Sequence, residues 1–383
     1  YRRMKKILID INSIVPYFAC GKINGIGRTT KELVESLSRI EDLPFEITLY
    51  SQNMKGIGGR NLDTKFKSYH LYYPNREKWN KALSFFPVRE WMTRYDLMHI
   101  PHNFEYVHRP QQCVITLHDA LFMKMEEKEF GHDHMRRQVP PLIRSCRRVI
   151  TCSEYSKKDI VETMQVSPDK IDVIPWGVRH DQFYPSDDIE ESLHFVKRRF
   201  NITRPYFLSV SCNAERKRSN ILVQAYMELF KQQIPNHDLV LVWANPPFEL
   251  LKEIEQSNIS NRIHFLSNVR DEELRNFYQA STASFNPSSY EGFGLPILEA
   301  MACGTPAVTC RNSSLPEVGG DAALYLDEPV RDSLINMMIL FEKKQLPLSD
   351  IRIESIKQSS KFTWEKTTQQ TLSSYLRALN INT

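Results

Sequence analysis

Short apolar runs alternate with amphipathic stretches along the whole chain, a pattern typical of buried strands separated by surface helices. In the first half, the runs that predict strands are Lys6–Asp10, Phe45–Tyr50, Leu97–Ile100, Cys113–Leu117, Arg148–Cys152 and Lys170–Ile174. In the second half, they are Tyr206–Val210, Asp238–Trp243, Ile263–Phe265, Ala283–Asn286, Thr305–Thr309 and Ala323–Tyr325. Strands this rich in apolar residues indicate parallel sheets that are covered on both faces.

Between these strands, apolar residues recur at helical spacing. In Thr29–Ile40, for example, Leu33, Leu37 and Ile40 fall on one face of a helix. The other predicted helices are Ile221–Gln232, Glu272–Ala280, Ile297–Ala302 and Trp364–Leu379. The alternation predicts an α/β fold whose ligands bind at the carboxyl ends of the strands.

The alternation is interrupted at Trp176–Pro205, which contains prolines and the acidic cluster Asp187–Glu191. A chain of 383 residues is also too long for one ordinary hydrophobic core. We therefore predict two doubly wound, Rossmann-like domains, residues 1–180 and residues 181–362, that face each other across a cleft. That cleft is where we expect the ligand.

Composition excludes several classes of protein. Hydrophobic residues make up 41% of the chain and charged residues 25%, as in a globular domain, and no stretch reaches the roughly 20 apolar residues that span a bilayer. A net charge of +4 permits contact with phosphates, but no nucleic-acid-reading motif is present, so we expect no nucleic acid partner. Seven scattered cysteines without zinc spacing, and no secretion signal, predict a cytoplasmic protein with reduced thiols.

The segment Ser288–Pro306 carries the densest chemistry. Two glycines precede a helix that we expect to begin at Pro296, which makes its start an anion site. Glu291 in the loop and Glu299 in the first turn would point into the same cleft, where carboxylates accept hydrogen bonds from sugar or ribose hydroxyls. On those two residues alone, a capped surface helix is an equal alternative, since helix starts favour acids.

Three further strings place polar residues beside predicted strands or helices. Arg216, Lys217 and Arg218 follow the first strand of the second half, and the alternative there is a solvated charge run. His118 follows a strand of the first half, where a structural histidine is the alternative. Gly25 and Gly27 precede the first amphipathic helix, without the third glycine of a dinucleotide-binding loop.

Together these strings resemble the signature of family 4 retaining glycosyltransferases, which have the GT-B fold. The resemblance implies that Glu291 lies beside the donor sugar and that Glu299 binds the ribose. It also implies that the backbone between them holds the sugar and the diphosphate, at Gly292, Phe293, Gly294 and Leu295.

The same resemblance assigns the cations. In the family an arginine and a lysine contact the diphosphate, and Lys217 fits the lysine. The commoner spacing would place the arginine at Cys212, so Arg216 resembles the variant in which the two residues are neighbours. Arg218 remains an alternative for the arginine.

For the first domain, the resemblance implies that His118 hydrogen-bonds the donor sugar, with Asp119 orienting the imidazole or capping the next segment of the chain. It places Gly25 and Gly27 in a loop that faces the diphosphate and the acceptor. Two implications concern the second domain and the tail. Val269 lies in the segment that holds the base, and the helix of residues 363–383 crosses back to the first domain.

The activity that the resemblance implies is transfer of a hexose from a nucleotide diphosphate sugar with retention of configuration. The family's chemistry needs no protein nucleophile, because the departing phosphate assists removal of the acceptor's proton. It also implies no cofactor and no catalytic metal. A metal site built from His132, Asp133 and His134 with other histidines lacks any recognised ligand spacing.

The adjacent Arg216 and Lys217, with the string His118–Phe122, are most similar to mannosyl- and rhamnosyltransferases of surface-polysaccharide assembly. This similarity favours GDP-mannose as the donor, and a hydroxyl of a glycan or a lipid-linked oligosaccharide as the acceptor. A lipid-linked acceptor implies peripheral contact with the cytoplasmic face of the membrane. The alternatives are another GT-B activity, a sugar-nucleotide epimerase or a glycan phosphorylase, and a non-catalytic partner subunit.

Overall fold

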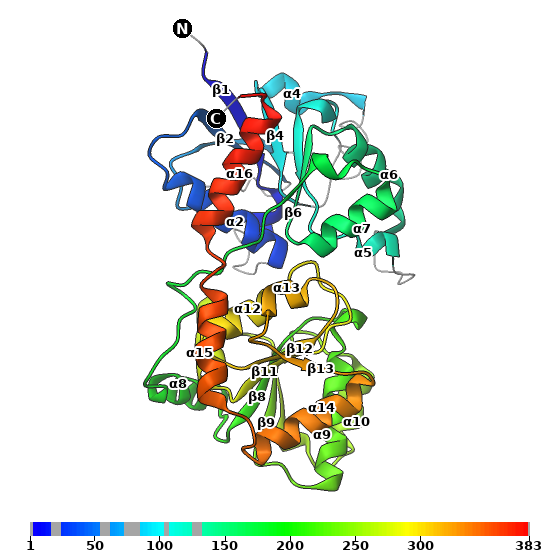
Figure 1. The fold of residues 1–383 in the computed structure, drawn as a ribbon, viewed down its shortest axis with the longest axis vertical. Helices are drawn as coiled ribbons and strands as arrows, with labels where there is room; N and C mark the ends of the chain where they lie inside the picture. The colour runs from blue at the N-terminus through cyan, green and yellow to red at the C-terminus, as the bar shows by residue number, and fades with distance from the viewer. Residues whose placement is uncertain are drawn as a thin grey trace. The chain divides into compact units, whose positions relative to one another are not determined.

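The computed structural model describes residues 3–16, 24–53, 62–72, 85–102, 107–124 and 132–381. The chain divides into two compact units, residues 1–177 with residues 364–383, and residues 178–363 (Figure 1). Each unit is an α/β layer structure with one parallel sheet.

The first unit holds a seven-stranded sheet in the order β3-β2-β1-β4-β5-β6-β7. Its strands are β1 (Lys5–Asp10), β2 (Phe45–Asn53), β3 (Lys67–Tyr72), β4 (Leu97–Ile100), β5 (Cys113–Thr116), β6 (Arg148–Thr151) and β7 (Ile171–Val173). Its α-helices are α2 (Gly25–Ser38), α4 (Val88–Met92), α5 (Leu121–Lys124), α6 (His132–Ser145), α7 (Glu154–Met164) and α16 (Trp364–Ala378).

The second unit holds a six-stranded sheet in the order β10-β9-β8-β11-β12-β13. Its strands are β8 (Tyr206–Val210), β9 (Asp238–Val242), β10 (Ile263–Leu266), β11 (Ala283–Asn286), β12 (Ala307–Cys310) and β13 (Leu324–Leu326). Its α-helices are α8 (Glu190–Phe200), α9 (Ser219–Gln232), α10 (Phe248–Glu255), α11 (Leu274–Ala280), α12 (Leu295–Ala302), α13 (Leu315–Gly319), α14 (Val330–Glu342) and α15 (Leu348–Ser359).

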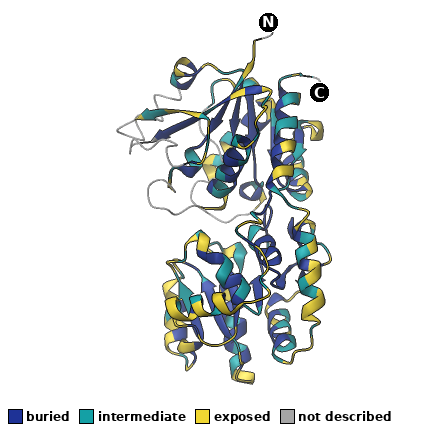
Figure 2. Cartoon of the chain, turned by 90° about the vertical axis from the view of Figure 1, so that its left-hand side faces the viewer, coloured by how far each residue is buried: buried dark blue, intermediate teal, exposed yellow. Residues whose placement is uncertain are grey.

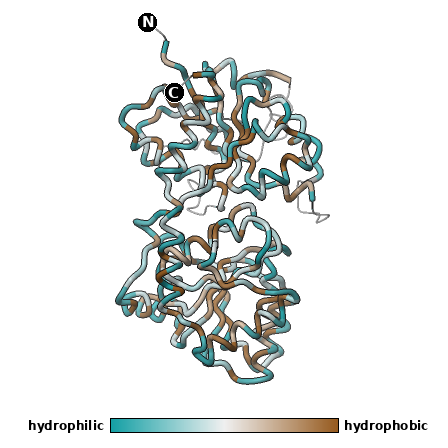
Figure 3. The backbone as a smooth tube through the Cα atoms, in the orientation of Figure 1, coloured by the Kyte–Doolittle hydropathy of each residue, from teal (hydrophilic) through white to brown (hydrophobic). Residues whose placement is uncertain are grey.

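Burial explains why the strands could be predicted. Central strands such as β4, β5 and β11 are buried at every residue. Dark blue strands run through the inside of both units in Figure 2, and brown, hydrophobic segments do so in Figure 3. All twelve predicted strands are present, with ends shifted by at most three residues. The edge strand β3 was missed because its residues are exposed or half-buried and form no apolar run.

The strand orders fix where ligands can bind. In each sheet the order reverses at one place, between β1 and β4 in the first unit and between β8 and β11 in the second. In doubly wound sheets the connections on either side of such a point run on opposite faces of the sheet, and ligands bind at the carboxyl ends of the two strands. Residues that follow β1, β4, β8 and β11 are therefore the ones that a ligand can reach.

The helix α16 belongs to the first unit and is held there by buried polar contacts. The Tyr375 hydroxyl lies 2.6 Å from His99 Nδ1, and Thr367 Oγ1 donates to the Pro175 carbonyl oxygen at 2.7 Å. Thr116 Oγ1 contacts the other ring nitrogen of His99 at 2.8 Å. Burial lowers the pKa of His99 to about 3, so this imidazole is neutral and both its nitrogens are hydrogen-bonded. Among the described helices, none is long and apolar enough to cross a membrane.

Replacing Tyr375 by Phe should lower the free energy of unfolding by about 1–3 kcal/mol, because a buried nitrogen of His99 loses its partner. Tyr72→Phe is the matched control, since Tyr72 is 57% exposed, and its expected effect is below about 0.5 kcal/mol. Urea unfolding followed by circular dichroism measures both. Equal midpoints for the two variants would show that the Tyr375 contact does not hold the helix.

Candidate functional site

At the switch point of the second unit, three charged residues meet. Arg216 and Lys217 lie in a 3₁₀ turn (Glu215–Lys217) after β8, and Glu291 lies in the loop after β11. Arg216 Nη1 is 3.1 Å from Glu291 Oε2, and Lys217 Nζ forms an ion pair with Glu291 Oε1. The structure thus brings together three of the residues predicted to act on the donor.

Glu291 is held as a carboxylate in this cluster. The side chain is buried, and burial by itself raises the pKa of a carboxyl group. Lys217 and Arg216 outweigh that effect, and Ser288 Oγ donates a hydrogen bond to Oε1 at 2.7 Å, so the pKa of Glu291 is lowered. The group is therefore an anionic hydrogen-bond acceptor at neutral pH.

The loop that carries Glu291 is fixed by two serines to which the sequence motifs assign no role. Ser314 Oγ contacts the carbonyl oxygens of Glu291 and Phe293 at 2.8 and 2.9 Å, and Ser313 Oγ accepts from the Glu291 N–H at 3.0 Å. Both serines follow β12, so the rule that pointed to His118, polar residues after a strand, could have found them.

A left-handed glycine ends the loop. Gly294 has a φ of +109°, and a Cβ there would lie 3.0 Å from Leu315 Cδ2, so the position favours glycine. The helix α12 begins at Leu295, directly after this glycine, so the partial positive charge of the helix N-terminus lies at the end of the loop.

The helix start corrects two details of the prediction. Pro296 is the second residue of α12, and Glu299 is its fifth residue, which places Glu299 in the second turn and not the first. Glu299 is buried, and its Oε2 accepts a hydrogen bond from the Tyr278 hydroxyl at 3.0 Å. The shift arises because Gly294 takes the N-cap position one residue earlier than expected.

The structure separates the two candidate arginines. Arg218 has a left-handed backbone with φ of 52°, and its Nη1 pairs with Glu328 Oε1 at 2.9 Å. Arg216 instead contacts Glu291, and the Arg216 carbonyl oxygen accepts from the Ser289 N–H at 2.7 Å. The geometry therefore favours Arg216 as the neighbour of Lys217 in the cluster.

Other residues named for the nucleotide lie in this unit. Val269 is half-buried after β10, and Cys212, which replaces the commoner arginine, is exposed after β8. Trp243 Nε1 donates to Asn213 Oδ1 at 2.6 Å, which joins the ends of β9 and β8. The structure assigns no contact with a base to any of them.

In the first unit, His118 lies two residues beyond β5. Its Nε2 donates to the Pro101 carbonyl oxygen at 3.1 Å, and its ring packs on Trp176 with 5.5 Å between centroids. Burial lowers the pKa of His118 to about 4, against the opposing effect of the Pro101 hydrogen bond and with help from the charge of His102. The imidazole is therefore neutral, and since Nε2 carries the proton, Nδ1 carries a lone pair.

Asp119 and the glycines have local roles. Asp119 Oδ1 accepts from the Leu121 N–H at 3.0 Å, which caps the start of α5. Gly25 and Gly27 were expected in a loop, but they form the first turn of α2, because Asn24 Oδ1 accepts from the Gly27 N–H at 2.7 Å and caps the helix earlier. A Cβ at Gly25 would meet no atom of the described residues within 4 Å.

The described part of the chain holds no cluster of metal ligands and no disulfide. Within those residues, no group of three His, Cys, Asp or Glu side chains could hold a metal ion. The six cysteines that the structure describes are free, and five of them are buried.

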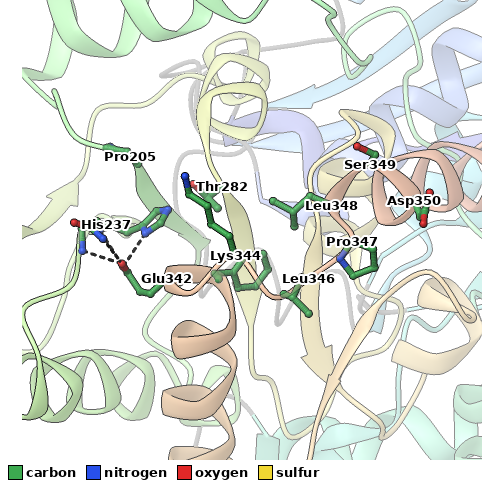
Figure 4. A pocket seen from close by; sticks show the side chains of 12 residues that line it. Pro205, His237, Thr282, Glu342, Lys344, Leu346, Pro347, Leu348, Ser349 and Asp350 are labelled. Carbon is green, nitrogen blue, oxygen red and sulfur yellow. Dashed lines mark hydrogen bonds and ion pairs between the residues drawn. The ribbon is translucent and has the colours of Figure 1, made fainter.

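A pocket of about 760 Å³ lies elsewhere in the second unit (Figure 4). It is lined by Pro205 and Thr282, which precede β8 and β11, so it lies at the amino-terminal edge of the sheet, away from Glu291. In its wall His237 Nδ1 contacts Glu342 Oε1 at 2.7 Å, while Glu342 Oε2 accepts from the Asn236 N–H at 3.0 Å. These bonds join the loop before β9 to the end of α14, so both carboxylate oxygens of Glu342 are already hydrogen-bonded within the protein.

Comparisons with known proteins agree with this geometry. Residues 191–358 match the family model "Glycosyl transferases group 1", and residues 23–182 match "Glycosyltransferase Family 4". The O-antigen chain mannosyltransferase B of Escherichia coli is 28% identical over 380 residues, which cover 92% of this chain and 96% of that protein. The serotype-specific mannosyltransferase WbdA of Escherichia coli is 24% identical over 70% of this chain and 34% of its own length.

Solved structures show the same fold at low identity. A sucrose-phosphate synthase from Thermosynechococcus elongatus has a TM-score of 0.72 and 18% identity, covering 97% of this chain and 98% of that one. WaaG, a glycosyltransferase involved in lipopolysaccharide biosynthesis, has a TM-score of 0.71 and 14% identity, covering 96% and 98%. The fold is therefore GT-B. With a matching family model over each of its two units, the chain belongs to the family 4 glycosyltransferases.

Proposed function

We propose that this glycosyltransferase moves mannose from GDP-mannose to a hydroxyl of a glycan or lipid-linked oligosaccharide, with retention of configuration and without a metal ion. The observation that carries the proposal is the cluster of Arg216 and Lys217 against the buried Glu291 at the switch point of the second unit. The mannosyl group is supported by the names of the mannosyltransferases that the chain resembles.

The two cations suit a diphosphate leaving group. As the bond between the sugar C1 and the phosphate oxygen breaks, negative charge grows on that oxygen. A well-placed hydrogen-bond donor at such an oxygen contributes about 3–4 kcal/mol in other enzymes. Arg216 and Lys217 supply that charge, and the N-terminus of α12 adds the partial charge of its N–H groups. A metal ion is then not required for this task.

Glu291 suits positioning better than nucleophilic attack. Its carboxylate oxygens are already bonded to Arg216, Lys217 and Ser288, which lowers their nucleophilicity while leaving lone pairs for sugar hydroxyls. In the proposed step the acceptor oxygen bonds to C1 on the face that the phosphate leaves. The acceptor proton passes to the departing phosphate oxygen, so no protein base is needed.

The remaining residues are assigned by the family resemblance. We propose that Glu299 binds the ribose and that Val269 lies by the base. His118 would contact the donor sugar, with Asp119 capping the segment that follows it. Gly25 and Gly27 would face the diphosphate and the acceptor. A lipid-linked acceptor would bring the protein to the cytoplasmic face of the membrane as a peripheral protein.

Lys217→Ala should lower kcat by about 100- to 1000-fold, because one donor of charge to the leaving phosphate is lost. Lys231→Ala is the control, since Lys231 lies at the far end of α9 and is exposed. Initial rates of mannosyl transfer measure both variants. Turnover of Lys217→Ala within a factor of about two of wild type would contradict the assignment.

A thermal-shift screen with GDP-, UDP- and dTDP-sugars identifies the donor. A ligand at 100 times its dissociation constant stabilises the folded protein by about 2.7 kcal/mol, so the true donor should stand out. We expect GDP-mannose to give the largest shift and Lys217→Ala to abolish most of it. A larger shift with a UDP-sugar would reject the guanine assignment, and acceptor-independent consumption of the donor would indicate an epimerase.

A further inference from the structure

The switch point of the first unit carries a buried pair, a carboxylate and an imidazole, that the proposed reaction does not use. Asp10 is the last residue of β1, and His102 follows β4 by two residues. His102 Nε2 lies 2.8 Å from Asp10 Oδ1, and the two residues are 6% and 1% exposed. Because buried charges are costly, a pair at the position where ligands bind calls for a role.

The pair is joined to His118 through one peptide group. The residue before His102 is Pro101, whose carbonyl oxygen accepts from His118 Nε2 at 3.1 Å. Thr30 Oγ1 of α2 approaches the same oxygen at 3.4 Å, and Ser13 Oγ donates to Thr30 at 2.9 Å. The main chain that follows β4, at Pro101 and His102, is thus anchored by the contact of His102 with Asp10 and by the hydroxyl of Thr30 in α2.

The Pro101 carbonyl oxygen in this segment determines which ring nitrogen of His118 carries the hydrogen. A carbonyl oxygen can only accept, so a neutral His118 that bonds to it must carry its hydrogen on Nε2. Nδ1 is then an acceptor for a hydroxyl group. If the Pro101 carbonyl turned away, the two tautomers would become close in energy and Nδ1 would lose that fixed role.

We propose that Asp10 and His102 are positioning residues that hold His118 in the tautomer whose Nδ1 accepts a hydrogen bond from a sugar hydroxyl. The identity of that hydroxyl rests on the proposed function, whereas the tautomer does not.

The electrostatic interactions around Asp10 and His102 also favour a neutral His118. Among the residues that the structure describes, Asp10, His99 and His118 interact electrostatically with His102, and Arg89 acts on Asp10. Burial opposes ionisation of Asp10, but His102 and the Asn12 N–H, which donates to Oδ1 at 2.8 Å, lower its pKa. Burial lowers the pKa of His118, and His102 adds to that effect, so the His118 imidazole stays neutral.

Nitrogen-15 NMR of the ligand-free protein tests the tautomer directly. In wild type between pH 6 and 8, we expect His118 Nε2 protonated and Nδ1 unprotonated, with the signals assigned by their loss in His118→Gln. Asp10→Asn and His102→Asn should each give a mixture of tautomers. The control is Asp172→Asn, which breaks a carboxylate's bonds to Arg148 at 2.7 Å and Ser374 at 2.6 Å. Asp172 lies on the edge strand β7, four positions from β1 in the strand order.

Kinetics separate positioning from mere stability. Asp10→Asn should lower kcat by roughly 10- to 100-fold, as loss of an outer partner does for functional histidines elsewhere, with the donor KM unchanged. The double variant with His118→Gln should be no slower than His118→Gln alone, because both changes act on one group.

Three results would overturn the proposal: a wild-type His118 protonated on Nδ1, an Asp10→Asn variant with an unchanged tautomer, or losses in the double variant that multiply. A protein that keeps the expected tautomer but binds no sugar nucleotide would instead reject the proposed function and leave the positioning device in place.

Discussion

A carboxylate taken out of water must be paired, and the switch point of the second unit is organised around that requirement. Glu291 is buried in the loop after β11, and its two partners come from the turn after β8. The pairing therefore joins two loops that are more than 70 residues apart in sequence. Ser313 and Ser314, which follow a third strand, β12, form hydrogen bonds with the main chain of the same loop. Removing the carboxylate would leave two half-buried cations facing each other, so the loops and the charges depend on it together.

The first unit meets the same requirement with a different pair. Its switch point holds Asp10 and His102, a carboxylate and an imidazole, where the second unit holds a carboxylate with a lysine and an arginine. Doubly wound sheets leave only the carboxyl ends of two strands open at this place, so polar groups that a ligand must meet are concentrated there. Charge chemistry then distinguishes the units: strong permanent cations suit a phosphate, and a neutral histidine suits a hydroxyl.

Much of this arrangement could be predicted from the sequence because parallel strands are buried on both faces and appear as apolar runs. The exposed edge strand β3 has no such run, and it was missed. Glu299 was placed one turn too early because the left-handed conformation of Gly294, which starts the helix at Leu295, is a tertiary feature. The choice between Arg216 and Arg218 needed the turn at residue 218, where φ is positive and the side chain leaves the cluster.

The partners in contacts that join distant loops could not be predicted, because no local sequence pattern indicates them. Ser314 contacts the carbonyl oxygens of Glu291 and Phe293 across more than 20 residues. Its place after β12 marks it as a candidate, but its partners do not follow from the sequence around it. Asp10 and His102 are 92 residues apart, and each alone resembles an ordinary polar residue after a strand. Only the strand order places them together.

A crystal structure of the protein with GDP tests the central claim most directly. We predict the diphosphate against Arg216 and Lys217 and the ribose hydroxyls against Glu299, with Glu291 free to meet a sugar. A diphosphate bound at any other place, such as the pocket lined by His237 and Lys344, would contradict this assignment.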